Sequence, residues 1–348
     1  MTKIKKTKQQ ETSWYHLGNW LEPALAAEVW LNYAKYAQQF FKGKLDGKIL
    51  YLNGDFFLSQ HDVTIMKRES YEAAKNHDRA FFNKIKKTII SVSDAITRSS
   101  RTISSPLEFL ESYKELTGVW MPLNVISLGV EQYANEVDSK ELKASWGITA
   151  EKPWTLKQLD EMRALKKEIV TVPESLDQLP KNLQQKIKNH VLTYEWKGSH
   201  HFIIHEFTAE ELLKQMKDDT CEKSVKQNED THSSNLLDFM GFIRFRCAET
   251  SGVSTYYLSK HLTKLAKTYG MSYEDFVEHT IEEIKAGKIT RSTAEQRKRN
   301  TGFLFDNEVH LLTDEEVKYY TDKLLQTTVS SIQEVRGTIA CKGKAKGL

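Results

Sequence analysis

The longest regular pattern in the sequence is an apolar series between residues 236 and 269 that matches the repeat of an α-helix. Large apolar side chains recur every three or four residues on both sides of Gly252, at Leu236, Met240, Ile243, Cys247, Leu258, Leu262, Leu265 and Tyr269. Gly252 lowers the helix propensity at the centre of this series. Only six prolines and 16 glycines interrupt the 348 residues. The sequence therefore predicts a mainly α-helical fold with long helices.

The first hundred residues carry two more helical segments. Pro23 suits the first turn of a helix, and one apolar face follows it before Gly43, made of Leu25, Val29, Tyr33, Tyr36 and Phe40. Residues 61–99 contain neither glycine nor proline. They predict one long helix, or two helices with a break at 76–78. The aromatic cluster that precedes Pro23 consists of Trp14, Tyr15, Leu17 and Trp20.

Hydroxyl side chains followed three residues later by glutamate mark further helix starts. Such capping boxes begin at Ser105, Thr208, Thr280 and Thr313. Gly270 suits a helix C-terminus because glycine accepts a left-handed backbone there. Pro122 is expected to kink or split the helix that begins after Ser105, near Val119. The final helix is expected to run to about Thr327.

Two β-hairpins interrupt the helices. Residues 48–52 and 55–58 are apolar and aromatic, and they flank Asn53-Gly54, the dipeptide preferred in type I′ hairpin turns. Residues 302–305 and 309–312 flank a second short turn. Around these elements the domain organisation is expected to be a disordered basic tail (1–12), an N-terminal helical domain (13–217), a mobile loop (218–234), a helical connector domain (235–330) and the start of a third domain (331–348).

Charge and cysteine content favour a cytoplasmic protein that binds neither nucleic acid nor a membrane. The chain has 50 basic and 47 acidic residues, and the signs are mixed along it. A basic helix face is nevertheless present, at Lys84, Lys86, Lys87, Arg98 and Arg101, and we interpret it as a solvated face. No apolar stretch reaches the ~20 residues that a membrane helix requires. Cys221, Cys247 and Cys341 are widely spaced, as reduced thiols would be.

Two clusters invite a ligand hypothesis. His200, His201 and His205 have spacings that suit a metal, but the interleaved apolar residues 202–204 favour a packed segment, and a zinc site requires three or four ligands in fixed geometry. The basic helix expected at 289–299 could hold a phosphate group through Arg291, Arg297, Lys298 and Arg299. A solvated helix face is the favoured interpretation. We assign no catalytic, cofactor-binding or metal-binding residue.

The C-terminal residues carry a glycine-rich pattern. Small residues at Gly337, Ala340, Gly343, Ala345 and Gly347 give G-x-x-A-x-x-G-x-A-x-G. This pattern resembles the beginning of the swivelling phosphohistidine domain of the phosphoenolpyruvate-utilising enzymes, the family of phosphoenolpyruvate synthase and rifampin phosphotransferase. Residues 270–276 and 280–287, followed by a basic helix and a linker helix, resemble the connector that precedes this domain. The resemblance covers about the last third of the chain.

The resemblance implies that the chain is the helical portion of a phosphotransferase-like protein. In that family a histidine on the swivelling domain carries a phosphoryl group, and ATP or phosphoenolpyruvate with Mg²⁺ is required. The swivelling domain is expected beyond Leu348, and a separate nucleotide-binding protein is a further expected partner. The sequence departs from the family because its first 230 residues contain no glycine-rich phosphate loop. The chain alone is expected to be inactive. The alternative is a helical interaction or regulatory module without a role in phosphotransfer.

Overall fold

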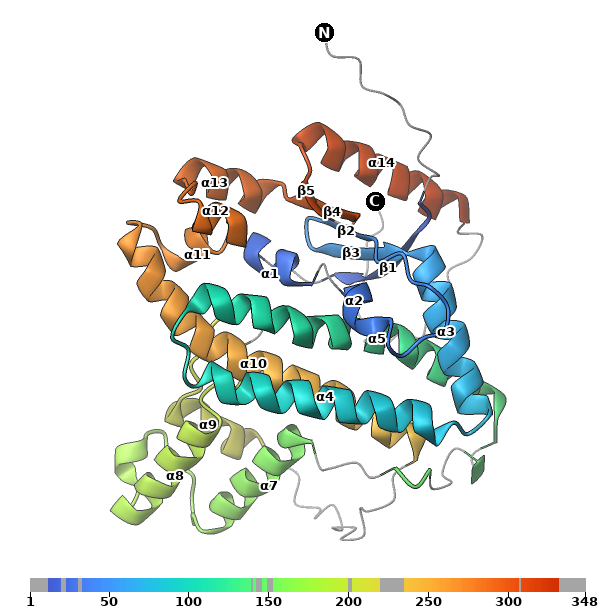
Figure 1. Ribbon diagram of the computed structural model, residues 1–348. Helices are drawn as coiled ribbons and strands as arrows, with labels where there is room; N and C mark the ends of the chain where they lie inside the picture. The colour runs from blue at the N-terminus through green and yellow to red at the C-terminus, as the bar shows by residue number, and fades with distance from the viewer. Residues whose placement is uncertain are drawn as a thin grey trace.

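The computed structural model describes residues 12–19, 23–30, 33–138, 140–141, 146–148, 153–199, 202–219, 235–306 and 308–331. The fold is mainly α-helical with one small antiparallel sheet, which confirms the predicted fold class (Figure 1). The helices are α1 (Ala24–Val29), α2 (Tyr33–Ala37), α3 (Gln60–Lys75), α4 (Arg79–Ser100), α5 (Pro106–Glu136), α7 (Trp154–Lys167), α8 (Lys181–Thr193), α9 (Ala209–Asp218), α10 (Leu236–Thr268), α11 (Tyr273–Phe276), α12 (Ile281–Lys285), α13 (Arg291–Arg299) and α14 (Asp314–Ser331). A short 3-10 turn, Leu176–Gln178, precedes α8.

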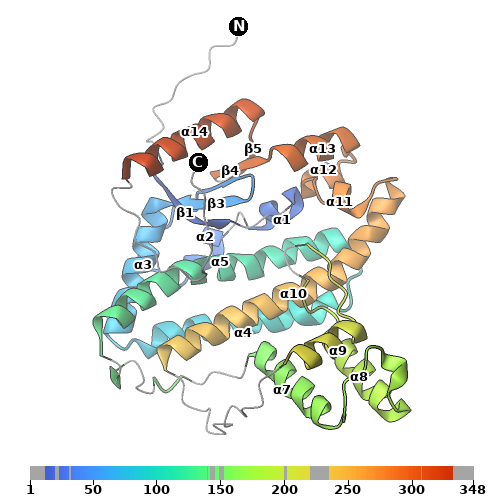
Figure 2. The same ribbon diagram turned by 180° about the vertical axis from the view of Figure 1, so that it is seen from behind.

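The long central helices α4, α5 and α10 lie side by side and supply nearly half of the buried residues of the main core (Figures 1 and 2). Helix α10 is a single helix of 33 residues, as its apolar series predicts. Phe239 of α10 packs edge-on against Phe82 of α4, with ring centroids 5.9 Å apart. The hydroxyls of Tyr113 on α5 and Ser251 on α10 are 2.8 Å apart. Aromatic packing and a buried hydrogen bond therefore hold the three helices together.

Of the two alternatives predicted for residues 61–99, the structure has two helices with a break at 76–78, whereas a split of α5 near Val119, one of the two effects expected of Pro122, is wrong. Between α3 and α4, His77 takes a φ of 51°, and the side chain of Asp78 caps α4 by accepting from Phe81 N. Helix α5 runs from Pro106 to Glu136 with Pro122 inside it. A proline removes one backbone donor from a helix. In α5 the contacts with α2, α3, α4 and α10 hold the remaining turns in place.

All described strands form one sheet in the order β1–β3–β2–β4–β5. The strands are β1 (Trp14–Asn19), β2 (Ile49–Leu52), β3 (Asp55–Ser59), β4 (Gly302–Asp306) and β5 (Glu308–Leu311). Both predicted hairpins are present, and Asn53 and Gly54 have φ of 48° and 101° as a type I′ turn requires. They are not separate, because β2 pairs with β4 from Ile49↔Phe305 to Leu52↔Gly302.

The central strand β2 is buried on both faces of the sheet. Ile49 and Tyr51 point into the main core, while Leu50 and Leu52 belong to a second, smaller cluster with Val317 of α14. This alternation follows from the two-residue period of a strand. In Figure 1 the sheet lies between α14 above and the long helices below. Burial on both faces explains why residues 49–52 are continuously apolar rather than alternating.

The structure near the N-terminus adds a strand and corrects one expectation. The aromatic cluster that begins at Trp14 includes an edge strand, β1, which pairs with β3 across a bulge between His16 and Gly18. The single helix expected after Pro23 is two short helices, with a turn at Trp30. Its apolar face is nevertheless buried as predicted at Leu25, Val29 and Tyr33. Leu25 N, a first-turn donor without a partner inside the helix, bonds Val277 O and ties α1 to the C-terminal half.

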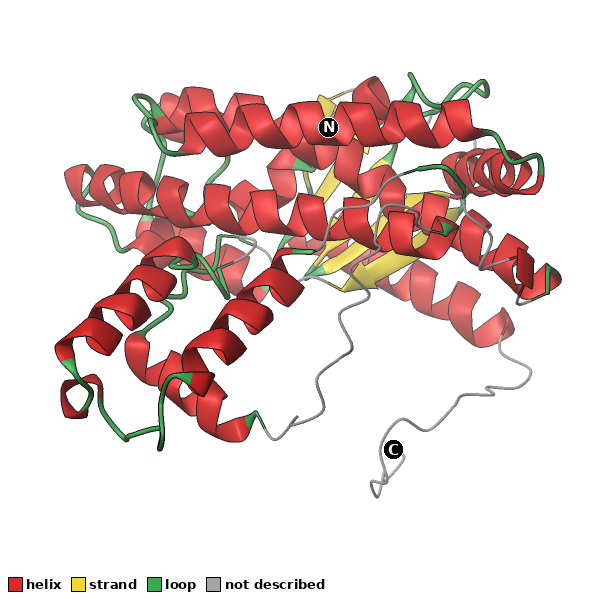
Figure 3. Ribbon diagram, turned by 90° about the horizontal axis from the view of Figure 1, so that it is seen from below, coloured by secondary structure: helices red, strands yellow, loops and turns green. Residues whose placement is uncertain are grey.

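Helices α7, α8 and α9 pack around a core of their own against the middle of α10 (Figure 3). Val253 and Tyr256 are the α10 residues in this cluster. The main core contains residues from both expected domains, 13–217 and 235–330. The boundary between these domains stays a prediction. The tail (1–11), most of the loop (220–234) and the glycine-rich segment (332–348) lie outside the described residues. Among the helices that are described, none combines the length and apolarity needed to cross a bilayer.

Candidate functional site

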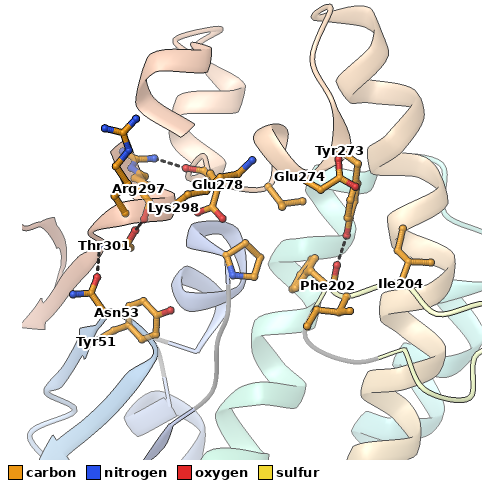
Figure 4. Close-up of a pocket in the computed structure, with 14 residues that line it drawn as sticks. Tyr51, Asn53, Phe202, Ile204, Tyr273, Glu274, Glu278, Arg297, Lys298 and Thr301 are labelled. Atoms are coloured by element: carbon orange, nitrogen blue, oxygen red, sulfur yellow. Dashed lines mark hydrogen bonds between the residues drawn. The ribbon is translucent and has the colours of Figure 1, made fainter. Parts of the chain in front are cut away.

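A pocket of about 630 Å³ lies between the sheet and the short helices α11 and α13 (Figure 4). Segments from five places in the chain line it. Its apolar wall is made of Pro23, Tyr51, Phe202, Ile203, Ile204 and Val277. Its charged wall is made of Glu274, Glu278, Arg297, Lys298 and Arg299. A volume of this size with one apolar and one polar wall is typical of small-molecule sites.

The turn of the first hairpin fixes one side of the pocket. Asn53 donates its backbone N–H to Thr301 O at 2.8 Å, and its side-chain oxygen accepts from Thr301 N at 2.7 Å. The Asn53 amide also donates to Asn300 Oδ1 at 3.1 Å. These bonds join the predicted Asn-Gly turn to the end of α13. They hold Tyr51 and Thr301 in place on the pocket wall (Figure 4).

Tyr273 fixes the opposite side. Its phenol donates to Phe202 O at 2.7 Å and lies 2.8 Å from Ser259 Oγ of α10. Because a phenol has one hydrogen, the Ser259 hydroxyl is the donor in the second contact. Burial raises the pKa of Tyr273, so the phenol stays protonated and keeps its bond to Phe202. This bond holds residues 202–204 against α11 and presents Ile203 and Ile204 to the pocket.

Acceptors on α12 and just after α11 hold the Arg297 guanidinium. Its terminal nitrogens donate to both carboxylate oxygens of Glu283, at 2.6 and 2.7 Å, and to Glu278 O at 2.8 Å. Burial works against ionisation of Glu283, but hydrogen bonds from Arg297 and Thr280 N outweigh burial and lower the pKa of Glu283. The Arg297 side chain is 12% exposed. Arg297 therefore acts as a structural tie between α12 and α13.

The remaining cations of α13 differ in how they are held. Lys298 lies 2.6 Å from Asp275, and this hydrogen bond lowers the pKa of the Asp275 carboxyl. Arg291 donates to Gly270 O at 3.0 Å. The Arg299 guanidinium makes no hydrogen bond or ion pair with the described residues, and it borders both the pocket and a neighbouring hollow of about 300 Å³. Of the four cations expected on this helix, Arg297 and Lys298 are neutralised by carboxylates of the protein.

Glu278 is the carboxyl at the centre of the pocket (Figure 4). Its contact within the described residues is a long one, with Ala24 N donating to Oε2 at 3.3 Å. Burial raises the pKa of Glu278, and the nearby charges of Lys298 and Arg297 only partly oppose this effect. A carboxylate has about four lone-pair sites. Glu278 therefore keeps unused acceptor capacity in a partly buried position.

Of the histidine cluster, the structure describes His205. His205 lies 3.1 Å from Glu211, and its backbone bonds the Ser199 hydroxyl through both N and O. His200 and His201 lie outside the described residues. On the basic face of α4, the Lys84 ammonium donates to Gln39 O at 2.6 Å, while Arg98 is exposed. Of the cysteines, Cys247 is buried, and burial raises the pKa of its thiol.

A different group, Asp46, His61 and Asp62, has the spacing of metal ligands, within 4.8 Å of one another. Asp62 is already engaged, however. Its carboxylate accepts from Asp46 N at 2.7 Å, from Gly47 N at 2.9 Å and from the hydroxyl of Tyr33. Burial and the Asp62 carboxylate raise the pKa of Tyr33. These bonds hold the loop before β2 against α3, which gives Asp62 a structural role.

Sequence reasoning found the basic residues of α13 but missed Glu278 and the apolar wall. No local pattern joins Pro23, Tyr51, Phe202 and Glu278, because their proximity depends on the pairing of β2 with β4. No family model, curated protein or solved structure matches the chain. The arrangement is a pocket with an apolar wall, two cations already paired with carboxylates of the protein, and the partly buried carboxyl of Glu278.

Proposed function

We propose that this chain is the helical portion of a phosphoenolpyruvate-utilising, phosphohistidine-dependent phosphotransferase-like protein. Its role is to position a swivelling phosphohistidine domain beyond Leu348. The proposal rests on the order of the segments 270–276, 280–287 and 337–347 in the sequence. The chain itself supplies neither the phosphorylated histidine nor the nucleotide site. ATP or phosphoenolpyruvate with Mg²⁺ belongs to the complete system.

The anchoring of the connector to the rest of the chain supports this role. A domain that swings between two sites requires a fixed base. Strand β4 pairs with β2, Leu25 N bonds Val277 O, and Tyr273 bonds Phe202 O. These contacts tie the segment from α11 to β4 to three separate places in the part of the chain before residue 218. Such a base suits a protein whose moving part lies further along the chain.

The competing function is a helical interaction module without phosphotransfer. One observation favours it: β5 is at the edge of the described sheet, and all four of its residues are exposed. Val309 and Leu311 are 37% and 43% exposed. An exposed edge strand with apolar side chains can pair with a strand of another protein.

Two experiments separate these functions. The reading frame after Leu348 should continue for about a hundred residues, the size of a small domain, and should encode a histidine flanked by threonine or glycine. A stop codon after Leu348 would favour the interaction module. The protein made from the longer frame should then acquire acid-labile phosphate from labelled ATP or phosphoenolpyruvate with Mg²⁺, on that histidine.

The matched control is the 348-residue chain under the same conditions. We expect no histidine-linked label on it, because phosphoryl transfer depends on metal ions, amides and cations placed around the phosphates. A stoichiometric label on the short chain would contradict the proposal. The cluster of His200, His201 and His205 would then be the first place to mutate.

A further inference from the structure

We propose that the pocket between the sheet and α11–α13 binds a small molecule that carries a protonated amine on an apolar body, with Glu278 as its counter-ion. This inference goes beyond the proposed function and does not depend on it. The phosphotransferase resemblance includes residues 270–276 and the basic helix, but it assigns no ligand to them. Three observations support the inference. The pocket has an apolar wall, the Arg297 and Lys298 side chains are already paired with carboxylates of the protein, and the Glu278 carboxylate has acceptor sites without a donor among the described residues.

The apolar wall of the pocket indicates that the body of the ligand is apolar. Tyr51 and Phe202 are almost fully buried and close the inner part of the pocket. Ile203 and Ile204 are 48% and 36% exposed at its rim, although both are large apolar residues. Exposed apolar residues that line a cavity mark a binding surface. A ligand with an aromatic or branched aliphatic body would cover them and remove that apolar surface from water.

The charged wall sets the polar group of the ligand. An anion would need cations with capacity to spare, but the Arg297 guanidinium is bound to Glu283 and the Lys298 ammonium to Asp275. An anion would also meet the carboxylates of Glu278 and Glu274. Of the lining cations, Arg299 alone lacks a partner among the described residues. The arrangement therefore disfavours a phosphate or carboxylate ligand and favours a cation.

Glu278 is the group that such a cation would meet. Its carboxylate is partly buried and, in the part of the chain that the structure describes, receives one long contact, from Ala24 N. An ammonium group has three donors and would satisfy the oxygen atoms that the protein leaves underused. A charge-assisted hydrogen bond in this partly desolvated place is stronger than one in water. Glu274, exposed at the rim, adds a second negative charge on the path into the pocket.

The test uses phenethylamine as the probe, with phenethyl alcohol as its neutral counterpart and hydrocinnamate as its anionic one. Protein labelled at isoleucine methyl groups is titrated with each compound and observed by NMR. Signals of Ile203 and Ile204 report binding in the pocket itself. Their assignment comes from the Ile203→Val and Ile204→Val variants.

We expect phenethylamine to shift the Ile203 and Ile204 signals saturably. Its Kd should rise at least about tenfold in Glu278→Gln, the change that corresponds to loss of one strong contact. Phenethyl alcohol should bind both proteins equally and more weakly than the amine binds the wild type. Glu282→Gln is the matched control, because Glu282 is 77% exposed on α12 and does not line the pocket. It should leave the Kd unchanged.

Three results would overturn the inference. The first is tighter binding of hydrocinnamate than of phenethylamine, which would make the pocket an anion site around Arg299. The second is an unchanged Kd of phenethylamine in Glu278→Gln. The third is the absence of saturable shifts at Ile203 and Ile204. Glu278→Gln should fold, since the glutamine oxygen can still accept from Ala24 N, and its thermal unfolding is measured alongside.

Discussion

The indole of Trp196 lies against the backbone of α10 at Gly252, so closely that a methyl group on Gly252 would be 3.0 Å from its Cε3 atom. The same methyl group would lie 3.1 Å from Ser199 O. Trp196 belongs to the core of α7, α8 and α9, and it contacts Trp154 with ring centroids 4.7 Å apart. The absence of a side chain at Gly252 thus lets this smaller core sit directly on the central helix.

We expect Gly252→Ala to destabilise the protein even though alanine favours helix. The added methyl group must push residues 196–199 away from α10, at a cost of about 1–3 kcal/mol, against a propensity gain of about 1 kcal/mol. Gly241→Ala is the control on the same helix, because no atom lies within 4 Å of the position that its new methyl group would take. Urea unfolding should show a gain of about 0.5–1 kcal/mol for this control. Equal gains for both variants would contradict the prediction.

Arg297→Lys should weaken the tie between α12 and α13. Lysine keeps the charge but cannot donate to both Glu283 oxygens and to Glu278 O together. We expect a loss of about 1–3 kcal/mol in the free energy of unfolding. Lys298→Gln is the comparison, since its pair with Asp275 is more exposed and worth about 0–1 kcal/mol. Similar losses of unfolding free energy in the two variants would mean that the two-bond contact of Arg297 with Glu283 adds no stability.

Much of the helical structure could be predicted because its signals are local. The capping boxes at Thr208 and Thr280 form as expected, with both reciprocal bonds. Gly270 and Gly287 end their helices with φ of 67° and 64°. Each of these features depends on residues within four positions of one another. The Asn53-Gly54 hairpin is local in the same sense.

The sheet and the pocket could not be predicted in this way. Ile49 pairs with Phe305, although most of the helical core lies between these two residues in the sequence. Hydrophobic patterns identify strands but do not say which distant strand is the partner. The pocket depends on this pairing and on the bond from Tyr273 to Phe202. The sequence alone therefore does not distinguish Glu278 from the other acidic residues.

Glu278 should make the protein less stable as it ionises. Burial raises its pKa in the folded state, so its favourable contribution is present below the ordinary glutamate value and is lost as the pH rises through the folded value. We expect Glu278→Gln to gain stability relative to the wild type between about pH 4 and pH 8. Urea unfolding at several pH values measures this difference. A difference that does not change with pH would contradict the prediction.

His190 should make the stability of the α7–α9 core depend on pH in the opposite direction: this stability should fall as the pH drops. Burial lowers its pKa from the ordinary value of 6.5, although Glu161, 3.5 Å away, partly opposes the shift and Lys197 adds to it. The neutral ring contacts the Gln158 amide at 3.2 Å and packs against Tyr194. Because the unfolded chain takes up the proton first, this stability is present above about pH 6.5 and falls as the pH drops through the folded value.

The comparison of wild type with His190→Gln tests this sign. The variant loses some packing at all pH values, but it has no proton to take up. We therefore expect the stability gap between the two proteins to narrow from pH 7 to pH 5. Trp154 and Trp196 lie in or against this core, so their fluorescence during urea unfolding reports on it directly. A gap that stays constant or widens on acidification would show that His190 titrates without burial working against its charge.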